Sequence, residues 1–158
     1  MTLLCLRNRQ RTRSIDLRLL RKIIISLLKD ILEKPQFELG IHLIDANEMA
    51  TVNETFLQHH GSTDVITFDY NETKTKNELN GEIFISIDDA VKQSKQFHTS
   101  WQSELARYII HGILHLEGFD DLEPASRKKM KRAENEIVTK LERRFPLSKL
   151  QRQLRKKR

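Results

Sequence analysis

The chain has 158 residues, of which 38% are hydrophobic and 32% charged, and its formal net charge is +6. This balance is typical of one globular domain, and because no run of about 18 apolar residues exists we expect no membrane span. The apolar start of the chain precedes its arginines, the reverse of a signal peptide, and the only cysteine, Cys5, excludes an internal disulfide, so we expect a reducing, cytoplasmic location.

Apolar periodicity predicts the elements of the N-terminal part. Helical spacing predicts a first helix that Ser14 caps and Pro35 ends. Its predicted buried positions are Leu20, Ile24, Leu27, Leu28 and Ile31. Strict alternation of apolar and polar residues predicts a strand over residues 38–43. A second helix follows, with Asp45 or Asn47 as its cap.

The middle of the chain alternates strands with short connections. A run of β-branched and aromatic residues predicts a strand over 65–68. The polar segment 71–80 ends in an Asn80-Gly81 turn signal, and alternation predicts another strand over 82–87. A short helix is expected from about residue 88 to 97.

Two longer helices complete the predicted fold. Thr99 or Ser100 caps the first, and Pro124 opens the second, which Pro146 ends. Their predicted buried stripes are Leu105, Ile109, Ile113 and Leu116, then Met130, Ala133, Ile137 and Leu141. We interpret residues 1–146 as one α+β domain, and residues 147–158 as a basic tail that stays flexible until it binds a partner.

The most informative stretch for chemistry lies at the end of the helix that Ser100 or Thr99 caps. His111 and His115 are four residues apart, so they lie one turn apart on the same helical face. Gly118 permits a sharp exit, and Asp121 follows where a returning chain can approach the two imidazoles. Two nitrogen ligands and one carboxylate leave a position open for water, as in catalytic zinc sites, where the ion lowers the pKa of that water.

The identity of the third ligand and the class of chemistry stay open at this stage. Asp120 competes with Asp121 as the carboxylate ligand, or could instead accept a hydrogen bond from a histidine ring. The spacing also parallels the zinc motif of metzincin peptidases, but these have a glutamate general base where this chain has Gly112. A glycine cannot take a proton, which disfavours a peptidase. We interpret the other histidines as ordinary polar residues: His42, His59, His60 and His98.

Both ends of the chain are basic, whereas its middle is acidic. Residues 124–158 hold 14 Lys and Arg against 3 Asp and Glu, and the last ten residues hold six bases and no acid. Such ends suggest a polyanionic partner, and nucleic acid is the first candidate. The alternative is that these basic side chains only lie on the solvent-exposed faces of helices and bind no partner.

Three segments resemble the YbeY endoribonucleases, bacterial factors of rRNA maturation. Residues 111–120 (HGILHLEGFD) resemble the family signature HGxLHLxGYD. Residues 52–68 are similar to its LNxxYRxxxxPTDVLSF stretch, and residues 81–85 (GEIFI) to its GDIxI strand. The resemblance runs from about residue 38 to 143, which is most of the chain.

The resemblance implies a compact α+β fold with one mixed sheet packed by about five helices. It also implies a zinc-type metal ion held by His111, His115 and Asp121. The implied activity is endonucleolytic cleavage of single-stranded RNA in 16S rRNA maturation and ribosome quality control. The implied partners are precursor 16S rRNA and the ribosome or its proteins; the oligomeric state stays open.

The chain departs from the family pattern at three positions. The third ligand of the family is a histidine, and Asp121 stands there; an oxygen ligand makes Mn²⁺ or another divalent cation an alternative to Zn²⁺. Leu57 replaces an arginine suited to hold the scissile phosphate. Arg107 is a candidate substitute, with a structural salt bridge as its alternative role. Ser62 replaces a proline.

These departures leave three hypotheses. The first is a metal-dependent endoribonuclease that cleaves single-stranded RNA. The second, motivated by Leu57 and Asp121, is a non-catalytic assembly factor that binds RNA or a ribosomal protein and has a structural or vestigial metal site. The third is a metallopeptidase, which Gly112 disfavours.

Overall fold

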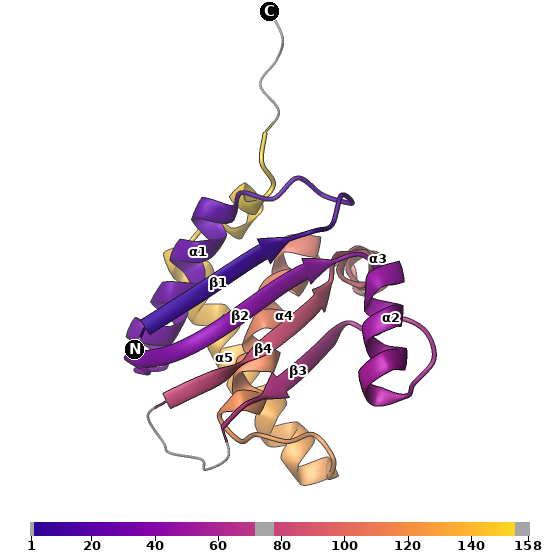
Figure 1. Cartoon of the computed structure of the whole chain (residues 1–158). Coiled ribbons are helices and arrows are strands. Elements are labelled where there is room, and N and C mark those ends of the chain that lie inside the picture. The colour runs from indigo at the N-terminus through magenta and orange to yellow at the C-terminus, as the bar shows by residue number, and fades with distance from the viewer. Residues whose placement is uncertain (1, 72–77, 154–158) are drawn as a thin grey trace, which may run out of the picture.

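The structure is a computed structural model that describes residues 2–71 and 78–153. Within these ranges the chain forms four strands, five α-helices and two short helical turns (Figure 1). In chain order these are β1 (Thr2–Asn8), α1 (Leu17–Ser26), η1 (Leu27–Ile31), β2 (Gln36–Ile44), α2 (Ala46–Leu57), β3 (Val65–Asp69), β4 (Glu78–Ser86), α3 (Ile87–Phe97), α4 (Trp101–Leu116), α5 (Pro124–Arg144) and η2 (Leu147–Leu150).

The strands form one mixed sheet in the order β1-β2-β4-β3. β1, β2 and β4 run parallel, and β3 pairs antiparallel with β4 at one edge. The register places Ile41 of β2 beside Ile83 of β4, and both side chains are fully buried. The expected α+β fold with a mixed sheet is therefore confirmed.

Helices α1, α4 and α5 cover the face of the sheet that lies behind the strands in Figure 1. The main core fills this layer and includes Ile83 and Ile85 of β4 together with Ile109 and Ile113 of α4. This packing of α4 against β4 and β3 fixes the position of the helix that carries His111.

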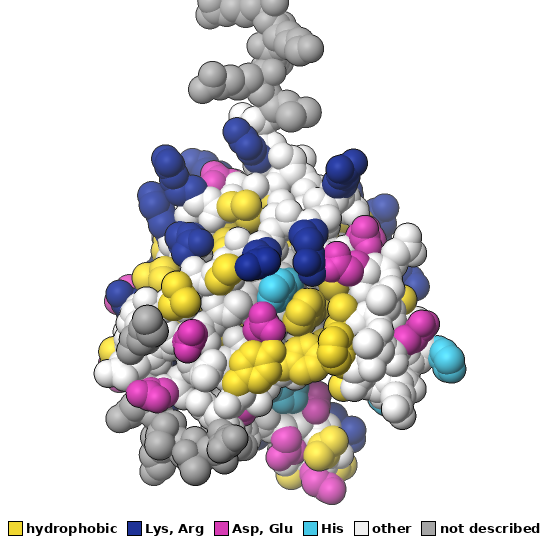
Figure 2. Space-filling model, viewed as in Figure 1, with side chains coloured by type: hydrophobic (Ala, Val, Ile, Leu, Met, Phe, Trp, Pro, Cys, Tyr) yellow, Lys and Arg dark blue, Asp and Glu magenta, His cyan; other side chains and the backbone are white. Residues whose placement is uncertain are grey.

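The opposite face of the sheet is covered only in part. Helix α2 buries a small cluster there, Ile44, Met49, Val52 and Ile66. The remainder of this face, seen in Figure 2, carries apolar side chains at its centre with Lys and Arg side chains above them. His42 stacks on Phe84 at 4.3 Å between ring centroids, and its Nε2 lies 2.9 Å from Glu82 Oε1. His42 thus has a structural role away from α4.

Side-chain caps fix the beginnings of most helices. Asp45 and Ser100 cap α2 and α4, each accepting a hydrogen bond from the backbone N–H three residues later. The expectation that Ser14 caps the first helix was wrong by two residues: Asp16 accepts from the Leu19 N–H at 3.0 Å. Ile15, between them, is buried and pairs with Gln151 in a β-bridge, which delays the start of α1.

Two further expectations for the elements were wrong. The N-terminal residues form β1, which the unbroken apolar run 3–6 does not reveal because it lacks the alternation of a half-buried strand. Asn80 and Gly81 lie inside β4 and make no turn. A Cβ atom on Gly81 would clash with the Phe68 carbonyl oxygen and lie 2.7 Å from Leu116 Cδ2. The glycine therefore lets the backbone of Phe68 and the side chain of Leu116 pack closely against β4.

The first residues after Pro146 pack against the domain. Leu147 and Leu150 of η2 are buried, and the Leu150 carbonyl accepts a hydrogen bond from the Asp16 N–H at 2.8 Å. The expected flexible tail was to begin at residue 147, but 147–151 are part of the packed structure. Residues 154–158 lie outside the described ranges. None of the described helices is long and apolar enough to cross a lipid bilayer.

Candidate metal centre

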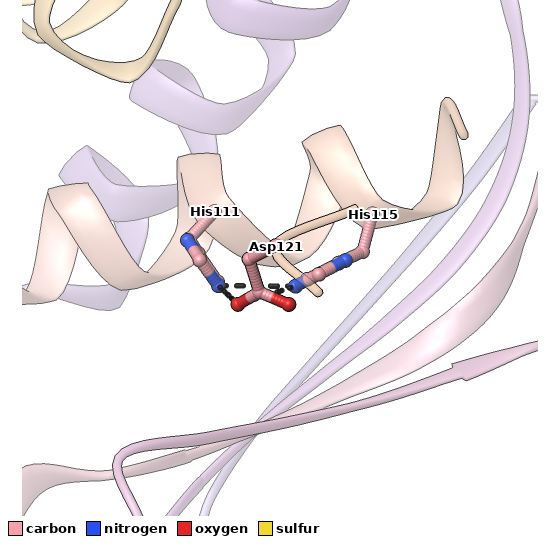
Figure 3. A group of neighbouring side chains, drawn as sticks. All are labelled: His111, His115 and Asp121. Carbon is pink, nitrogen blue, oxygen red and sulfur yellow. Dashed lines mark hydrogen bonds and ion pairs between the residues drawn. The ribbon is translucent and has the colours of Figure 1, made fainter. Parts of the chain in front are cut away.

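Helix α4 and the turn that follows it bring the predicted ligands together. Gly118 has a φ of +103°, a conformation that side-chain-bearing residues rarely adopt, and it ends the helix as expected. The Phe119 N–H then donates to the Leu114 carbonyl at 3.0 Å, which folds the chain back along the last helical turn. Asp121 returns to the same face as the two histidines for this reason (Figure 3).

The two imidazoles converge through their Nε2 atoms, which lie 3.0 Å apart. Both side chains are half-buried, with exposed fractions of 29% for His111 and 28% for His115. Asp121 Oδ2 lies 3.7 Å from Nε2 of His111 and 3.8 Å from Nε2 of His115. Within the described residues these three form a group whose ligand atoms all lie within 4.8 Å of one another.

The other ring nitrogens are held by acceptors. Nδ1 of His111 lies 3.0 Å from Glu134 Oε2 on α5, and Nδ1 of His115 lies 3.0 Å from the Phe119 carbonyl oxygen. A carbonyl or carboxylate oxygen can only accept, so in neutral rings the proton sits on Nδ1 and Nε2 carries a lone pair. Two lone pairs then face each other at 3.0 Å, an arrangement that a cation stabilises and that orients both rings as metal ligands.

The three ligand atoms fit a small divalent cation. Around a tetrahedral zinc ion with ligands at about 2.0–2.1 Å, neighbouring ligand atoms lie about 3.3 Å apart. The separation between the two nitrogens is slightly shorter than this, and those to the Asp121 oxygen are slightly longer. Asp121 is 45% exposed and can move by a few tenths of an ångström without disturbing the core.

Asp120 does not take either of the roles considered for it. Its side chain accepts a long hydrogen bond from the Leu122 N–H at 3.3 Å, which stabilises the local turn. It is exposed and is absent from the group formed by the two histidines and Asp121. The carboxylate that accepts from a histidine ring is Glu134.

Charges around the site raise the pKa of His111. Burial alone would lower it, but the hydrogen bond and negative charge of Glu134, with the charges of Asp121 and Asp64, outweigh the burial. The carboxylates near His111 thus favour a positive charge at this ring, which suits a cation.

Glu134 is the residue of the candidate site that spacing did not reveal. It is 8% exposed and lies on the inner stripe of α5 with Met130, Ile137 and Leu141, where the expected residue, Ala133, is only half-buried. The available signal was that Glu134 lies four residues after Met130, on the stripe predicted to be buried. A buried carboxylate is rare unless it is paired, so a glutamate at this position indicates a partner.

A cavity of about 510 Å³ opens beside the candidate ligands, and His111 and Asp121 belong to its wall. Three basic side chains line it: Arg107, Arg127 and Lys131. Arg107 donates to Glu134 Oε1 at 3.0 Å and to Asn135 Oδ1 at 2.7 Å, which is the salt-bridge role considered for it. Leu57 is 43% exposed at the end of α2 and is not part of the cavity wall.

The fold and the site define the class of protein: a small α+β domain that presents two histidine nitrogens and a carboxylate, the ligand types of catalytic zinc centres, beside a cavity lined in part by basic residues. Comparison with known proteins identifies the family. The family model of endoribonuclease YbeY matches residues 5–142, and the chain belongs to this family of endoribonucleases. The expected resemblance is confirmed.

Individual relatives agree with the family model. The chain is 43% identical over 106 residues to the endoribonuclease YbeY of Bacteroides fragilis, an alignment that covers 67% of this chain and 74% of the relative. It is 30% identical over 132 residues to that of Caldicellulosiruptor bescii, covering 77% and 84%. The solution structure of TM1509 from Thermotoga maritima shares the fold, with a TM-score of 0.69 and 22% identity over 99% of this chain and all of the other.

Proposed function

We propose that the protein is a metal-dependent endoribonuclease that cleaves single-stranded RNA in the maturation of 16S rRNA and in ribosome quality control, in the cytoplasm. The observation that carries the proposal is the pair of Nε2 atoms 3.0 Å apart, each on a ring whose Nδ1 is held by an acceptor. Membership of the YbeY family supports RNA as the substrate.

His111, His115 and Asp121 would hold the ion, Zn²⁺ or Mn²⁺. When bound, such an ion supplies a Lewis acid that lowers the pKa of water and stabilises charge on a phosphate. Glu134 and the Phe119 carbonyl keep the two rings oriented. Arg127 and Lys131, on the first turns of α5, place positive charge where the RNA backbone approaches the site.

The structure gives a physical reason to set the peptidase hypothesis aside. A Cβ atom on Gly112 would lie 2.8 Å from two carbons of Ile83, so the side-chain direction at this position points into the core. The glutamate that metzincins carry there could not reach the histidines without displacing β4.

The test uses protein stripped of metal and reconstituted with Zn²⁺ or Mn²⁺, with end-labelled single-stranded RNA and the same sequence in a duplex. We expect cleavage of the single strand only, lost on chelation and in His115→Ala. The matched control is His59→Ala, which removes an exposed histidine outside the site. Cleavage that survives metal removal would contradict the proposal.

A non-catalytic assembly factor is the second candidate, favoured by the replacement of the family arginine with Leu57, exposed and outside the cavity wall. The two candidates differ in a strain that lacks the protein. Full restoration of 16S rRNA maturation by Asp121→Ala would favour the assembly factor, whereas accumulation of precursor would favour the enzyme.

A further inference from the structure

The cavity beside the candidate metal centre extends well beyond the ligands. Its floor is α4, one wall is the first half of α5, and the other wall comes from α3 and the residue before β3. A volume of about 510 Å³ falls in the range of sites that hold small organic molecules. Of the residues that line this space only His111 and Asp121 are candidate metal ligands, so the remainder is available to another part of a substrate.

The lining differs in charge from one side to the other. Arg127 and Lys131 stand on the α5 wall, where the carboxylate of Glu134 is already taken by Arg107 and His111. Asp64, before β3, and Glu104, on the first turn of α4, are the other carboxylates that line the cavity besides Asp121. A nucleotide has the same division, because its phosphate is an anion and its base edge carries hydrogen-bond donors and acceptors.

Tyr108 supplies an independent sign of a missing ligand. The residue is 4% exposed and lines the cavity, and its hydroxyl has no hydrogen-bond partner within the described part of the chain. A buried hydroxyl left without a partner destabilises the fold. Burial and the charges of Asp64, Glu104 and Asp89 raise the pKa of Tyr108, so the hydroxyl stays protonated and able to donate.

An exposed aromatic ring stands at the same cavity. Phe97, the last residue of α3, lines the space and is 59% exposed. Unstacked RNA bases bind preferentially by stacking on such rings.

We propose that this cavity is a nucleobase subsite that takes a base bearing an exocyclic amino group from the RNA strand held at the metal centre. Tyr108 donates to a ring nitrogen or carbonyl of the base, and Asp64 accepts from its amino group. The carboxylates of Asp64 and Glu104 favour an amino group over the second carbonyl oxygen of uracil, because two acceptors repel each other. The inference rests on the proposed function and adds a base preference to it.

Binding of mononucleotides tests the subsite without cleavage or metal. CMP and UMP differ at the ring position where one carries an amino group and the other a carbonyl. With the metal-free full chain, we expect CMP to bind about tenfold more tightly than UMP, and ribose 5-phosphate more weakly than either. Equal binding of CMP and ribose 5-phosphate would overturn the proposal, because the base would contribute nothing.

Two matched variants separate recognition from folding. Tyr108→Phe removes only the hydroxyl that lacks a partner, so we expect an unchanged or higher melting temperature and about fivefold weaker CMP binding. Tyr70→Phe removes the other tyrosine hydroxyl, which donates to Glu82 on the open face of the sheet, and should leave CMP binding unchanged. Unchanged CMP binding in Tyr108→Phe would overturn the proposed role of the hydroxyl.

Cleavage of paired RNA substrates then distinguishes this proposal from the proposed function. We expect a strand with cytosine next to the cut to be cleaved faster than the same strand with uracil, and Tyr108→Phe to reduce the difference. Cleavage with no such difference would contradict the subsite proposal but still support the proposed endoribonuclease activity. Base-selective binding of CMP without any cleavage would support the subsite and contradict the endoribonuclease activity.

Discussion

Glu134 on α5 holds the ring of His111 on α4, with Oε2 3.0 Å from Nδ1, while its other oxygen accepts from Arg107 at 3.0 Å. One buried carboxylate thus joins a candidate metal ligand to the wall of the cavity. Because the two residues are 23 positions apart in the chain and lie on different helices, the packing of α5 against α4 directly determines how the candidate ligand is oriented.

Replacing Glu134 should weaken metal binding without removing a ligand. In Glu134→Gln the acceptor loses its charge, and we expect zinc affinity to fall about 10- to 100-fold, the usual effect of losing such a partner. The measurement is competition with a chromophoric chelator. Glu136→Gln changes an exposed glutamate of the same helix and should leave the affinity unchanged; equal losses in both variants would point to a general charge effect.

The raised pKa of His111 predicts how pH acts on the metal-free and metal-loaded protein. The folded-state pKa lies above the ordinary value of about 6.5. In the metal-free protein the charged ring therefore stabilises the fold below the unfolded pKa, and this contribution is lost as pH rises through the folded pKa. Metal binding has the opposite dependence, because it needs the neutral ring and weakens as pH falls through the same value.

Titration of the His111 ring by NMR in metal-free protein checks this prediction directly. We expect a midpoint above 6.5 in the native protein and a lower midpoint in Glu134→Gln. A native midpoint at or below 6.5 would contradict the conclusion that the hydrogen bond and the negative charges around the ring outweigh its burial.

Asp120 and Asp121 form a matched pair for testing the third ligand. Asp121→Asn should reduce metal affinity and RNA cleavage at least tenfold, because an amide oxygen is a weaker ligand than a carboxylate. Asp120→Asn should leave both nearly unchanged, since this side chain only accepts from the Leu122 N–H. A loss that is larger in Asp120→Asn would reverse the assignment of the two residues.

Gly112→Ala should destabilise the fold although alanine favours helices. The new Cβ would lie 2.8 Å from Ile83 Cδ1 and Cγ2, and overpacking of a core typically costs about 1–3 kcal/mol. Chemical denaturation measures the free energy of unfolding. Combining the change with Ile83→Ala, which removes both of these atoms, should cost less than the sum of the single effects; strict additivity would exclude the contact as the cause.

Truncation of the basic tail should begin after residue 153. A deletion from residue 149 would remove Leu150, which is fully buried, and its hydrogen bond with Asp16, so it would test stability along with RNA binding. Deleting residues 154–158 removes four basic residues and spares both. If these residues contact phosphates, their deletion should reduce the slope of log affinity against log salt concentration by up to about 3 for single-stranded RNA. An unchanged slope would mean that these basic side chains are solvated and do not contact RNA.

Local periodicity predicted much of the fold because most elements bury one face. Strands β2 and β3 and helices α2 to α5 lie close to their predicted ranges, since period-2 and period-3.6 patterns follow from burial of one side. Strand β4 was also predicted, but it begins four residues earlier than its alternating pattern indicated. The prediction failed where the role of a residue depends on contacts with residues far away in the sequence. Gly81 accommodates Phe68 and Leu116, and Ile15 pairs with Gln151, contacts that no short window of sequence contains.

The sequence by itself determined the candidate ligands, because a helix places His111 and His115 on one face and Gly118 lets the chain return toward them. Only the tertiary structure decided between Asp120 and Asp121 as the third member of the group, since that choice depends on the path of the turn after Gly118. It also placed Glu134 beside His111, formed the cavity and buried the hydroxyl of Tyr108, because α3 and α5 both pack against α4. Spacing along one helix is a local property, whereas the surroundings of its side chains are set by the elements packed against it.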